Sequence, residues 1–334
     1  MMFKRIAAIL TATIIASPVM AEVNIYSSRN PQLINPILEV FTAETGIKTN
    51  IVFIKDGLIE RLKAEGKRSP ADLVLTTDIS NLNAIVEAGV TQTVTSDIIN
   101  ANIPATFRDP DGNWFGLTSR ARVIYASVDR VAEGEVTTYE DLTDPKWKGR
   151  ICTRSGSHNY NIGLLSAVVA HYGEAGAEEW LTGLKANLAR KPQGNDRAQI
   201  KAIWAGVCDI AIGNTYYMGA MLQNEEQQAW ASSVTIQFPI LGDNGVHVNL
   251  SGMAMTKSAR NDEDALRLME YLTSEAAQTM YAELNFEYPL LETAQPSELV
   301  QGWGEFTPDS TPLVDIAKLR NIALKIVDRV NFNE

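Results

Sequence analysis

Short apolar runs alternate with helical patterns along most of the chain, and this alternation limits the folds that the sequence can adopt. Strands are predicted at residues 23–26, 48–54 and 72–76, because each is a short apolar stretch of strand length. Helices are predicted between them at residues 33–41 and 58–67, where apolar residues recur at helical spacing. The order strand–helix–strand–helix–strand predicts a parallel sheet covered by helices, with ligands bound beyond the carboxyl ends of its strands.

A second unit of the same kind begins after Arg150. It contains a strand, the loop TRSGSHNYN, a helix that continues through Tyr172, and a later strand at residues 207–212 with its own helix. Two such units predict an α/β protein with two lobes and a ligand cleft between them. We expect the lobes to be joined by strands near residues 117–126 and 245–255.

These crossing strands divide the chain into two discontinuous lobes. We expect the first lobe to comprise residues 22–118 with 244–293, and the second lobe to comprise residues 119–243 with 294–334. Each lobe is expected to hold a mixed, mostly parallel sheet covered by helices. The helix predicted at residues 262–274 carries apolar residues with charges between them, which indicates packing against a core.

The first residues are typical of a secretory signal peptide and are not expected to belong to the fold. Residues 1–5 form a short basic start, residues 6–15 are largely apolar, and Val19 and Ala21 occupy the −3 and −1 positions of a cleavage site. We therefore predict a signal peptide at residues 1–21 and an exported protein. No later stretch reaches the roughly 18 consecutive apolar residues that a spanning helix needs, so no membrane span is expected.

The net charge limits the classes of binding partner, and the two cysteines limit the covalent chemistry of the chain. The formal net charge is −11 at pH 7, and no Lys/Arg-rich run or basic, aromatic-studded stripe occurs, so nucleic acid is not expected as a partner. An exported chain meets an oxidising compartment, which favours a disulfide between Cys152 and Cys208. Two buried free thiols are the alternative. A thiolate metal site is disfavoured, because the three histidines show no ligand-like spacing with the cysteines.

Three tyrosines lie where a predicted strand gives way to a helix. Tyr216 and Tyr217 are adjacent in IGNTYYMG, directly after the strand at residues 207–212, and Tyr160 follows the earlier strand in GSHNYNIGLL. A free phenol is neutral at pH 7, but a highly charged metal ion stabilises the deprotonated form, and tyrosinate binds iron in one haem setting. Three phenolates would offset the charge of one ferric ion. The alternatives are ordinary tyrosines at the edge of a core, or an aromatic wall for a sugar or an amine.

Five segments carry a resemblance to a known family, and the similarity covers essentially the whole mature chain: YSSRN, LIERLKAEGKRSPADLVLTTD, GLTSRARVIY, SGSHNYN and IGNTYYMG. They resemble segments of periplasmic ferric-ion-binding proteins, which serve bacterial iron ABC transporters. The resemblance implies a type II-like, two-lobed periplasmic binding protein that closes on Fe(III), with Tyr160, Tyr216 and Tyr217 as ligands. It also implies that Arg120 holds a synergistic anion such as carbonate, for which a guanidinium fork is suited. The alternative for Arg120 is an ordinary salt bridge.

The sequence departs from this family in the first lobe. Many members carry a histidine, or a histidine followed by a tyrosine, after SSR, whereas this chain has Asn30 and Pro31. Asparagine is a poor Fe(III) ligand and proline has no side-chain donor. We therefore expect the first lobe to supply only contacts around the site, from Ser27, Ser28, Arg29 or Asn30. An exogenous anion or water would complete the coordination.

Other motifs are weaker. His158 lies two residues before Tyr160 and could reach the site, although a hydrogen-bonding or surface role is favoured. No G-x-S-x-G, G-x-G-x-x-G or P-loop motif occurs, so an enzyme is not expected. We predict a monomeric periplasmic protein that captures Fe(III) and delivers it to an inner-membrane iron ABC permease. A binding protein for an oxyanion or a polyamine is the alternative, although no acidic residues flank NTYYMG to hold a polyamine.

Overall fold

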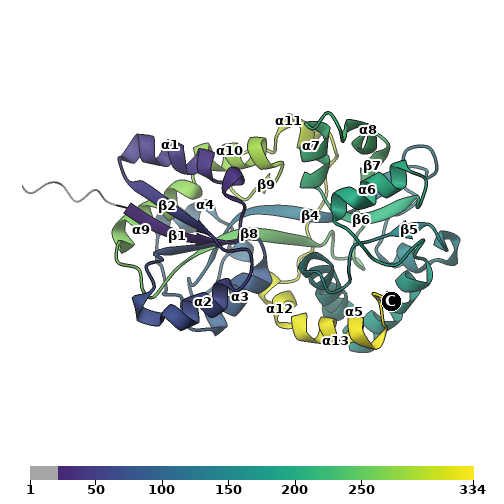
Figure 1. The fold of residues 1–334 in the computed structure, drawn as a ribbon, viewed down its shortest axis with the longest axis horizontal. Helices are drawn as coiled ribbons and strands as arrows, with labels where there is room; N and C mark the ends of the chain where they lie inside the picture. Colours follow the sequence, from purple (N-terminus) through teal and green to yellow (C-terminus); the bar gives the residue numbers. More distant parts are fainter. Residues whose placement is uncertain (1–21) are drawn as a thin grey trace, which may run out of the picture.

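The protein consists of two α/β bodies that lie side by side and share long strands (Figure 1). The computed structural model describes residues 22–334 of the 334-residue chain, and the signal peptide predicted for residues 1–21 lies outside the described residues. Within the described range, no helix combines the length and hydrophobicity needed to cross a bilayer. β4 (Phe115–Ser127) and β8 (Val248–Met255) run through the junction between the bodies. The two-lobed α/β fold is therefore confirmed, and the bodies are called the first and second lobes below.

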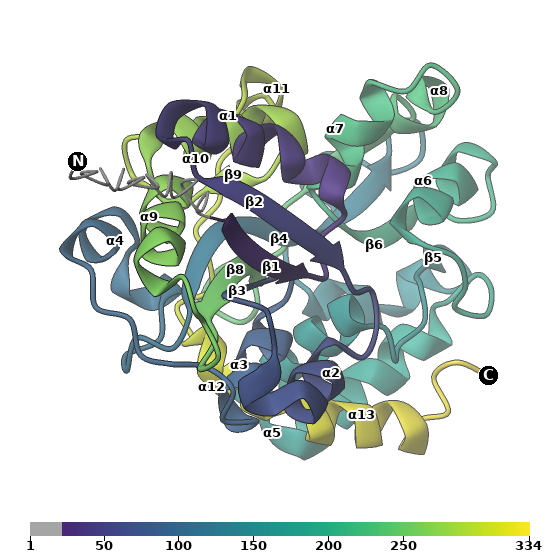
Figure 2. The same ribbon diagram turned by 60° about the vertical axis from the view of Figure 1, so that its left-hand side comes forward.

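The sheet of the first lobe has β1 between β2 and β3, followed by β8 and the first half of β4. β1 is parallel to β2 and β3, whereas β8 is antiparallel to β3 and β4. Helices α1 and α10 cover one face of this sheet, and α2 and α3 cover the other (Figure 2). The other elements of this lobe are β1 (Glu22–Ser27), α1 (Asn35–Thr45), β2 (Lys48–Phe53), α2 (Leu58–Glu65), β3 (Leu73–Thr76), α3 (Ile79–Glu87), α4 (Asp97–Asn102), α9 (Asp262–Leu272), α10 (Glu275–Asn285) and β9 (Tyr288–Pro289).

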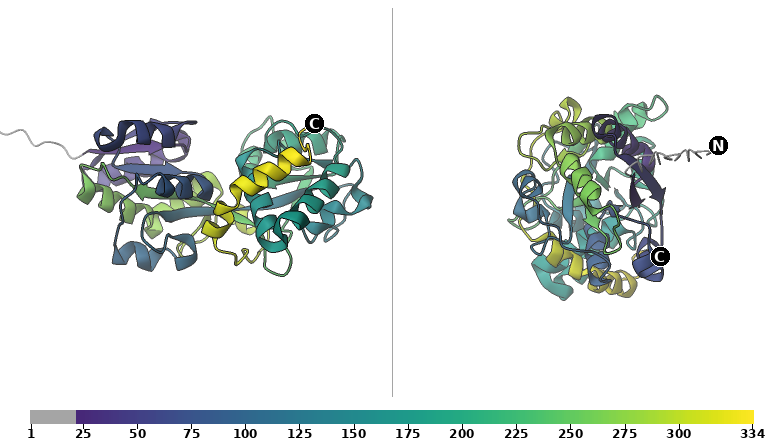
Figure 3. Two further views of the ribbon diagram at one scale, coloured as in Figure 1. Left: turned by 90° about the horizontal axis from the view of Figure 1, so that it is seen from below. Right: turned by 90° about the vertical axis from the view of Figure 1, so that its left-hand side faces the viewer.

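In the second lobe, the second half of β4 is antiparallel to both β6 and β7, and β5 joins β6 in parallel. The long helix α5 is interrupted at Gly173, whose φ of 70° is not helical. Helices α12 and α13 run from the junction along the second lobe (Figure 3), where α13 packs on α5. The other elements are β5 (Ile151–Cys152), α5 (Asn159–Ala186), α6 (Asp196–Trp204), β6 (Ile210–Asn214), α7 (Tyr216–Leu222), α8 (Gln228–Ala231), β7 (Val234–Gln237), α11 (Glu298–Gln301), α12 (Leu313–Lys318) and α13 (Arg320–Arg329). Short 3-10 helices lie at η1 (Pro31–Leu33), η2 (Gly66–Arg68), η3 (Ala105–Phe107), η4 (Glu140–Thr143) and η5 (Pro145–Trp147).

Both sheets are mixed, as predicted, but the parallel share is smaller than expected. The parallel pairs are β1–β2, β1–β3 and β5–β6, and every pair that involves β4 or β8 is antiparallel. The expectation of mostly parallel sheets came from local strand–helix–strand units, and those units do not include the strands that cross between lobes. The crossings predicted near residues 117–126 and 245–255 correspond to β4 and β8.

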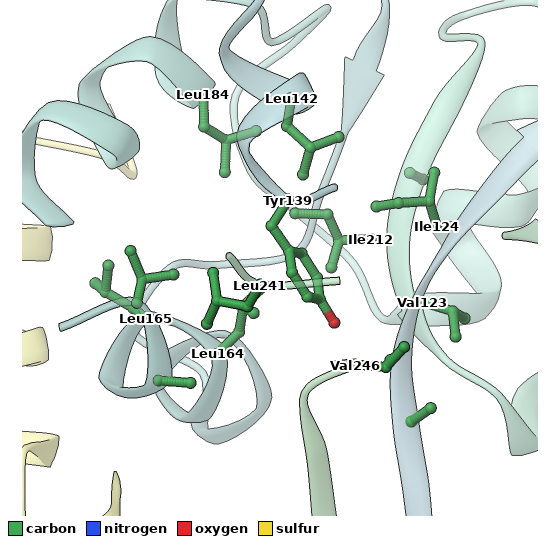
Figure 4. Packing of buried hydrophobic residues seen from close by; sticks show 14 of the residues in the cluster. Val123, Ile124, Tyr139, Leu142, Leu164, Leu165, Leu184, Ile212, Leu241 and Val246 are labelled. Atoms are coloured by element: carbon green, nitrogen blue, oxygen red, sulfur yellow. The ribbon is translucent and has the colours of Figure 1, made fainter. Parts of the chain in front are cut away.

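Each lobe has its own hydrophobic core. In the second lobe, the fully buried Tyr139 packs among apolar residues that include Ile124 of β4 and Ile212 of β6 (Figure 4). Burying a large apolar side chain stabilises a fold by roughly 1.5–3 kcal/mol. The same core includes Leu82 of α3 and the buried Trp114 beside β4, so the two lobes pack against each other at the junction.

Cys152 and Cys208, the pair considered above, are joined by a disulfide. Cys152 ends β5 and Cys208 lies just before β6, and both are buried. The bond closes a sequence separation of 56 residues. A loop of this length corresponds to about 4 kcal/mol of stabilisation in the chain-entropy model. The cross-link therefore fixes the two strands whose carboxyl ends carry the tyrosines.

Candidate metal centre

The two strand-to-helix junctions identified in the sequence lie next to each other. β5 and β6 are parallel neighbours, so their carboxyl ends meet at one edge of the sheet. α7 begins with Tyr216 just after β6, and α5 begins at Asn159 after a short loop from β5. The Tyr216 hydroxyl donates a hydrogen bond to the Tyr160 hydroxyl at 3.0 Å. The fold therefore brings together two phenols that are far apart in the sequence.

Tyr217 lies beside this pair. Its ring centroid is 4.4 Å from that of Tyr216, with 35° between the ring planes. Asn214, the last residue of β6, donates a long hydrogen bond of 3.4 Å from its side-chain amide to the Tyr216 hydroxyl. Tyr160, Tyr216 and Tyr217 are each half-buried, so the cluster lies at the surface of the lobe and not within its core.

The surroundings keep two of these phenols protonated in the absence of a cation. Burial, and then the neighbouring Tyr160, raise the pKa of Tyr217 to about 12. Burial, followed by Tyr160 and Tyr217, raises the pKa of Tyr216 well above its ordinary value near 10. A highly charged cation would reverse this preference by stabilising the phenolates. Among residues 22–334 no group of three or more His, Cys, Asp or Glu side chains could hold a metal ion, so the candidate ligands are the tyrosines.

Three arginines surround Tyr160. The guanidinium carbons of Arg120, Arg122 and Arg154 lie 6.0, 5.8 and 5.0 Å from the centroid of its ring. Arg120 and Arg122 are two residues apart on β4, which places them on the same face of the strand. The positive charge gathered around this ring favours an added anion.

A buried aspartate fixes two of the three arginines. Asp196, at the start of α6, accepts from Arg122 at 3.2 Å and from Arg154 at 3.1 Å. Arg122 also donates to Asn161 of α5 at 2.6 Å and to Asn214 at 2.9 Å. Sequence reasoning missed Asp196, because it lies between the two junctions in the chain and no local pattern connects it with either arginine.

Arg120 is held differently. It donates to the Ser251 hydroxyl at 3.3 Å and to the backbone carbonyl of Thr77. Within the described part of the chain, no carboxylate lies at salt-bridge distance from Arg120. The ordinary salt bridge that was the alternative for this residue is therefore not found, and its guanidinium has not been neutralised by direct pairing with a carboxylate.

The first lobe brings side chains to the same region, but most are already engaged. Arg29 is buried, donates to the Ser251 hydroxyl at 2.6 Å and forms an ion pair with the equally buried Glu287 at 2.6 Å. Asn30 is exposed, and its side-chain oxygen accepts from the Gln32 backbone N–H at 3.1 Å, which caps η1. The hydroxyl of Ser28 is buried and makes no hydrogen bond to the described residues.

His158 has the hydrogen-bonding position that the sequence favoured. It is the N-cap of α5, where its Nδ1 accepts from the Tyr160 backbone N–H at 3.2 Å. Its ring also packs edge-on against the Tyr160 ring, with centroids 4.6 Å apart. Burial, and then the charges of Arg154 and Arg122, lower the pKa of His158 to about 3, so the ring is neutral at physiological pH. The histidine therefore orients the start of the helix that carries Tyr160.

Two residues near the end of the sequence hold the loop before Tyr160, and sequence reasoning did not identify them. The Asn333 side-chain oxygen accepts from the Gly156 backbone N–H at 2.8 Å, and its amide donates to the Ser157 hydroxyl at 3.0 Å. Phe332 is fully buried, and a Cβ at Gly156 would lie only 2.6 Å from its ring. Glycine at position 156 is thus needed for the loop to lie on Phe332.

A cavity of about 220 Å³ separates the first lobe from the start of α5. Its walls include Ser28 and Lys55 from the first lobe and Asn159, the neighbour of Tyr160, from the second. Hollows of about 630 and 560 Å³ lie elsewhere, one beside β7 and one between η3 and α12. None of the three tyrosines lines either of these larger hollows, so the chemistry of the side chains, and not the size of a hollow, identifies the site.

Two α/β lobes that meet at a polar site define the class of two-lobed solute-binding proteins. This chain belongs to the bacterial extracellular solute-binding protein family, whose profile matches residues 68–302.

The similarity to known proteins covers nearly the whole of this chain. Iron uptake protein A1 of Synechocystis sp. is 44% identical over 314 residues, which cover 93% of this chain and 87% of that protein. The crystal structure of apo ferric ion-binding protein A from Pasteurella haemolytica has a TM-score of 0.89 and 51% identity, and covers 94% of this chain and 98% of its own. A Trichodesmium protein in complex with iron and citrate ligands has a TM-score of 0.90 and 41% identity, and covers 93% of this chain and 100% of its own.

Proposed function

We propose that this protein captures Fe(III) in the periplasm through Tyr160, Tyr216 and Tyr217 and delivers it to an inner-membrane ABC permease. The observation that carries the proposal is the contact between the Tyr216 and Tyr160 hydroxyls at 3.0 Å, with the Tyr217 ring beside them. The names of the relatives, iron uptake protein A1 and ferric ion-binding protein A, support iron as the solute. The protein acts by binding and release, without making or breaking covalent bonds in its solute.

Iron binding replaces a hydrogen bond between phenols with bonds from phenolates to the ion. Each tyrosine that binds loses its proton, and three phenolates offset the charge of one ferric ion. The lobes then close about β4 and β8. In this proposal the first lobe comprises residues 22–118 with 244–293, and the second lobe comprises residues 119–243 with 294–334. Closure excludes water from the ion. In this proposal the protein is a monomer, and the permease binds its open form preferentially, so that iron is released from the open form.

An exogenous anion completes the coordination in this proposal. Asn30 is occupied as a helix cap and Pro31 has no donor, so the first lobe offers no ligand at these positions. Arg120 has no carboxylate partner among the described residues, and its guanidinium can bind two oxygens of one anion. Carbonate fits this arrangement, and the iron and citrate named for the Trichodesmium structure show that a similar protein holds iron together with an organic anion.

Titration of the purified protein with Fe(III), with and without bicarbonate, tests the proposal. Charge transfer from tyrosinate to iron would produce a visible absorption band that grows with bound iron and strengthens when bicarbonate is present. A protein that binds Fe(III) at full affinity without any added anion would show that the first lobe supplies ligands after all. A colourless mixture with no bound iron would overturn the proposal as a whole.

A binding protein for a simple oxyanion is the second candidate, because the same arginines favour it. Arg120, Arg122 and Arg154 outnumber the single Asp196 that pairs with two of them. The same surplus of positive charge argues against a polyamine. An oxyanion-binding protein would bind phosphate or sulfate without iron and would remain colourless with Fe(III), so the titration separates the two candidates.

A further inference from the structure

Phe286 has an unusual backbone conformation. Its φ of 57° and ψ of 31° lie in the left-handed region, where a bulky side chain is rarely found. It is the C-cap of α10, a position that glycine commonly occupies in this conformation. Such strain persists only where the surrounding structure holds it in place, and it often occurs at functional positions.

The ring of Phe286 lies against the helix that carries the tyrosine pair. Phe286 is only 5% exposed, and a Cβ added at Gly219 of α7 would lie 2.6 Å from its Cδ1 atom. Real Cβ atoms essentially never approach a neighbour that closely, so only glycine at position 219 permits the contact. Gly219 is three residues after Tyr216 and therefore lies on the same side of α7.

The residues that follow Phe286 attach it firmly to the first lobe and to the crossing strand. Glu287 forms the ion pair with Arg29 and accepts from the Thr118 hydroxyl at 2.6 Å. The next strand, β9, pairs with Thr118 and Ser119 of β4, immediately before Arg120. Phe286 thus connects a fixed part of the first lobe with a helix of the second lobe.

We propose that Phe286 is a positioning residue that couples the orientation of the two lobes to the geometry of Tyr216 and Tyr217. Rotation of the first lobe about the crossing strands moves the ring of Phe286 against Gly219, and α7 follows. The tyrosine pair would then reach its iron-binding geometry in one lobe orientation and lose it in the other, which links lobe opening to iron release. This inference rests on the proposed function of the tyrosines as iron ligands.

A double-mutant cycle at the contact tests the inference. Gly219→Ala adds a methyl group where the ring lies, and Phe286→Ala removes the ring, so the double variant has room for the methyl group. In the presence of Phe286, Gly219→Ala should shift the visible band and speed iron release by roughly 10- to 100-fold, as losses of support around metal ligands typically do. In the Phe286→Ala background, adding Gly219→Ala should change neither quantity.

The controls separate coupling from loss of stability. Phe41→Leu alters a fully buried phenylalanine of the first-lobe core, so it should lower the melting temperature without moving the band. If Gly219→Ala does not fold, Phe286→Ala alone must still shift the band and speed iron release. The inference is wrong if Gly219→Ala has equal effects in both backgrounds, or if every variant matches the unchanged protein. Neither result affects the proposed function. An unchanged protein that remains colourless with Fe(III) overturns the proposed function, and the inference with it.

Discussion

The two lobes face the candidate site with very different side chains. The second lobe presents three phenols, two of them with raised pKa values, at the ends of parallel strands joined by a disulfide. The first lobe presents Arg29, whose charge is paired with Glu287, and Asn30, whose oxygen caps a short helix. The second lobe can therefore exchange protons for a cation, whereas Arg29 and Asn30 of the first lobe already have partners.

This difference indicates an order of events in the proposed mechanism. Glu287, the carboxylate beside Arg29, could become a ligand only if the buried Arg29–Glu287 pair broke, which would leave an uncompensated charge and be strongly destabilising. The tyrosines require only the loss of protons. Iron should therefore bind first to the second lobe, and closure should follow by adding charge and hydroxyl groups from the first lobe.

The largest effect is expected at the tyrosine pair, because losing a phenol removes the feature that distinguishes the second lobe from the first. Tyr216→Phe or Tyr217→Phe keeps the ring but removes a ligand oxygen, so the visible band should be lost. Fe(III) affinity should fall by more than the roughly 10- to 100-fold typical of changes around metal ligands. Tyr271→Phe in α9 is a matched control, because its hydroxyl has no hydrogen-bond partner in the described chain. Unchanged affinity in both site variants would rule out the tyrosines as ligands.

Acidification tests whether iron binding to the second lobe releases protons from its tyrosines. Because the pKa of Tyr217 is about 12 and that of Tyr216 is well above 10, both are protonated in the iron-free protein and must release protons on binding. Lowering the pH therefore opposes binding, and the affinity should fall about tenfold per pH unit for each proton displaced. Bound iron and released protons can be measured together between neutral and acidic pH. Iron retention that is independent of pH in this range would contradict phenolate ligation.

Arg120 sharpens the comparison, because it lies on the strand that both lobes share. Arg120→Ala should remove most of the dependence of iron affinity on bicarbonate, a loss of roughly tenfold, while some tyrosinate colour persists. Arg120→Lys should keep only part of the bicarbonate dependence, because lysine cannot bind two oxygens in a fork. Arg61→Ala removes the same charge at an exposed pair with Glu65 and should leave the bicarbonate dependence intact. If Arg120→Ala binds iron with the full bicarbonate dependence, the anion is held elsewhere.

The smallest effect is expected at Asn333, which supports the second lobe from outside the site. Asn333→Ala removes the hydrogen bonds to Gly156 and Ser157, so the loop before Tyr160 should become less ordered. Iron release should be faster by no more than about tenfold, with little change in melting temperature because Asn333 is exposed. Asn333→Asp keeps the acceptor for the Gly156 N–H and should recover most of the loss. Stopped-flow release to a competing chelator measures both variants.

The sequence was informative wherever the signal was local. The position of Tyr160, Tyr216 and Tyr217 at strand-to-helix junctions follows from short apolar runs and from the parallel arrangement of β5 and β6. For His158 the sequence favoured a hydrogen-bonding role, and the structure gives that role its form as the N-cap of α5. Such patterns report the period of one segment, and each junction could be located without knowledge of the rest of the chain.

Most other contacts between distant segments could not be obtained from such local patterns. The antiparallel pairs of β4 and β8 join residues that are far apart in the chain, and hydrophobic period does not encode strand direction. Asp196 shows no sign in the sequence that it will meet Arg122 and Arg154, and Gly219 shows no sign that it will meet Phe286. In each case the partner is set by the packing of whole elements, which local propensity does not determine.

The sharing of β4 also has a consequence for how this chain folds. The first half of the strand completes one sheet and the second half completes the other, so unfolding either lobe removes a hydrogen-bonded neighbour from its companion. β3 pairs with β1 early in the chain, but it gains its second partner, β8, only when Leu73 pairs with Met255 much later in the sequence. Until then β3 has an open edge, the kind of surface on which strands of separate chains pair and aggregate. The N-terminal elements must therefore wait for most of the polypeptide, which favours slow and cooperative assembly of both lobes over completion of one lobe at a time.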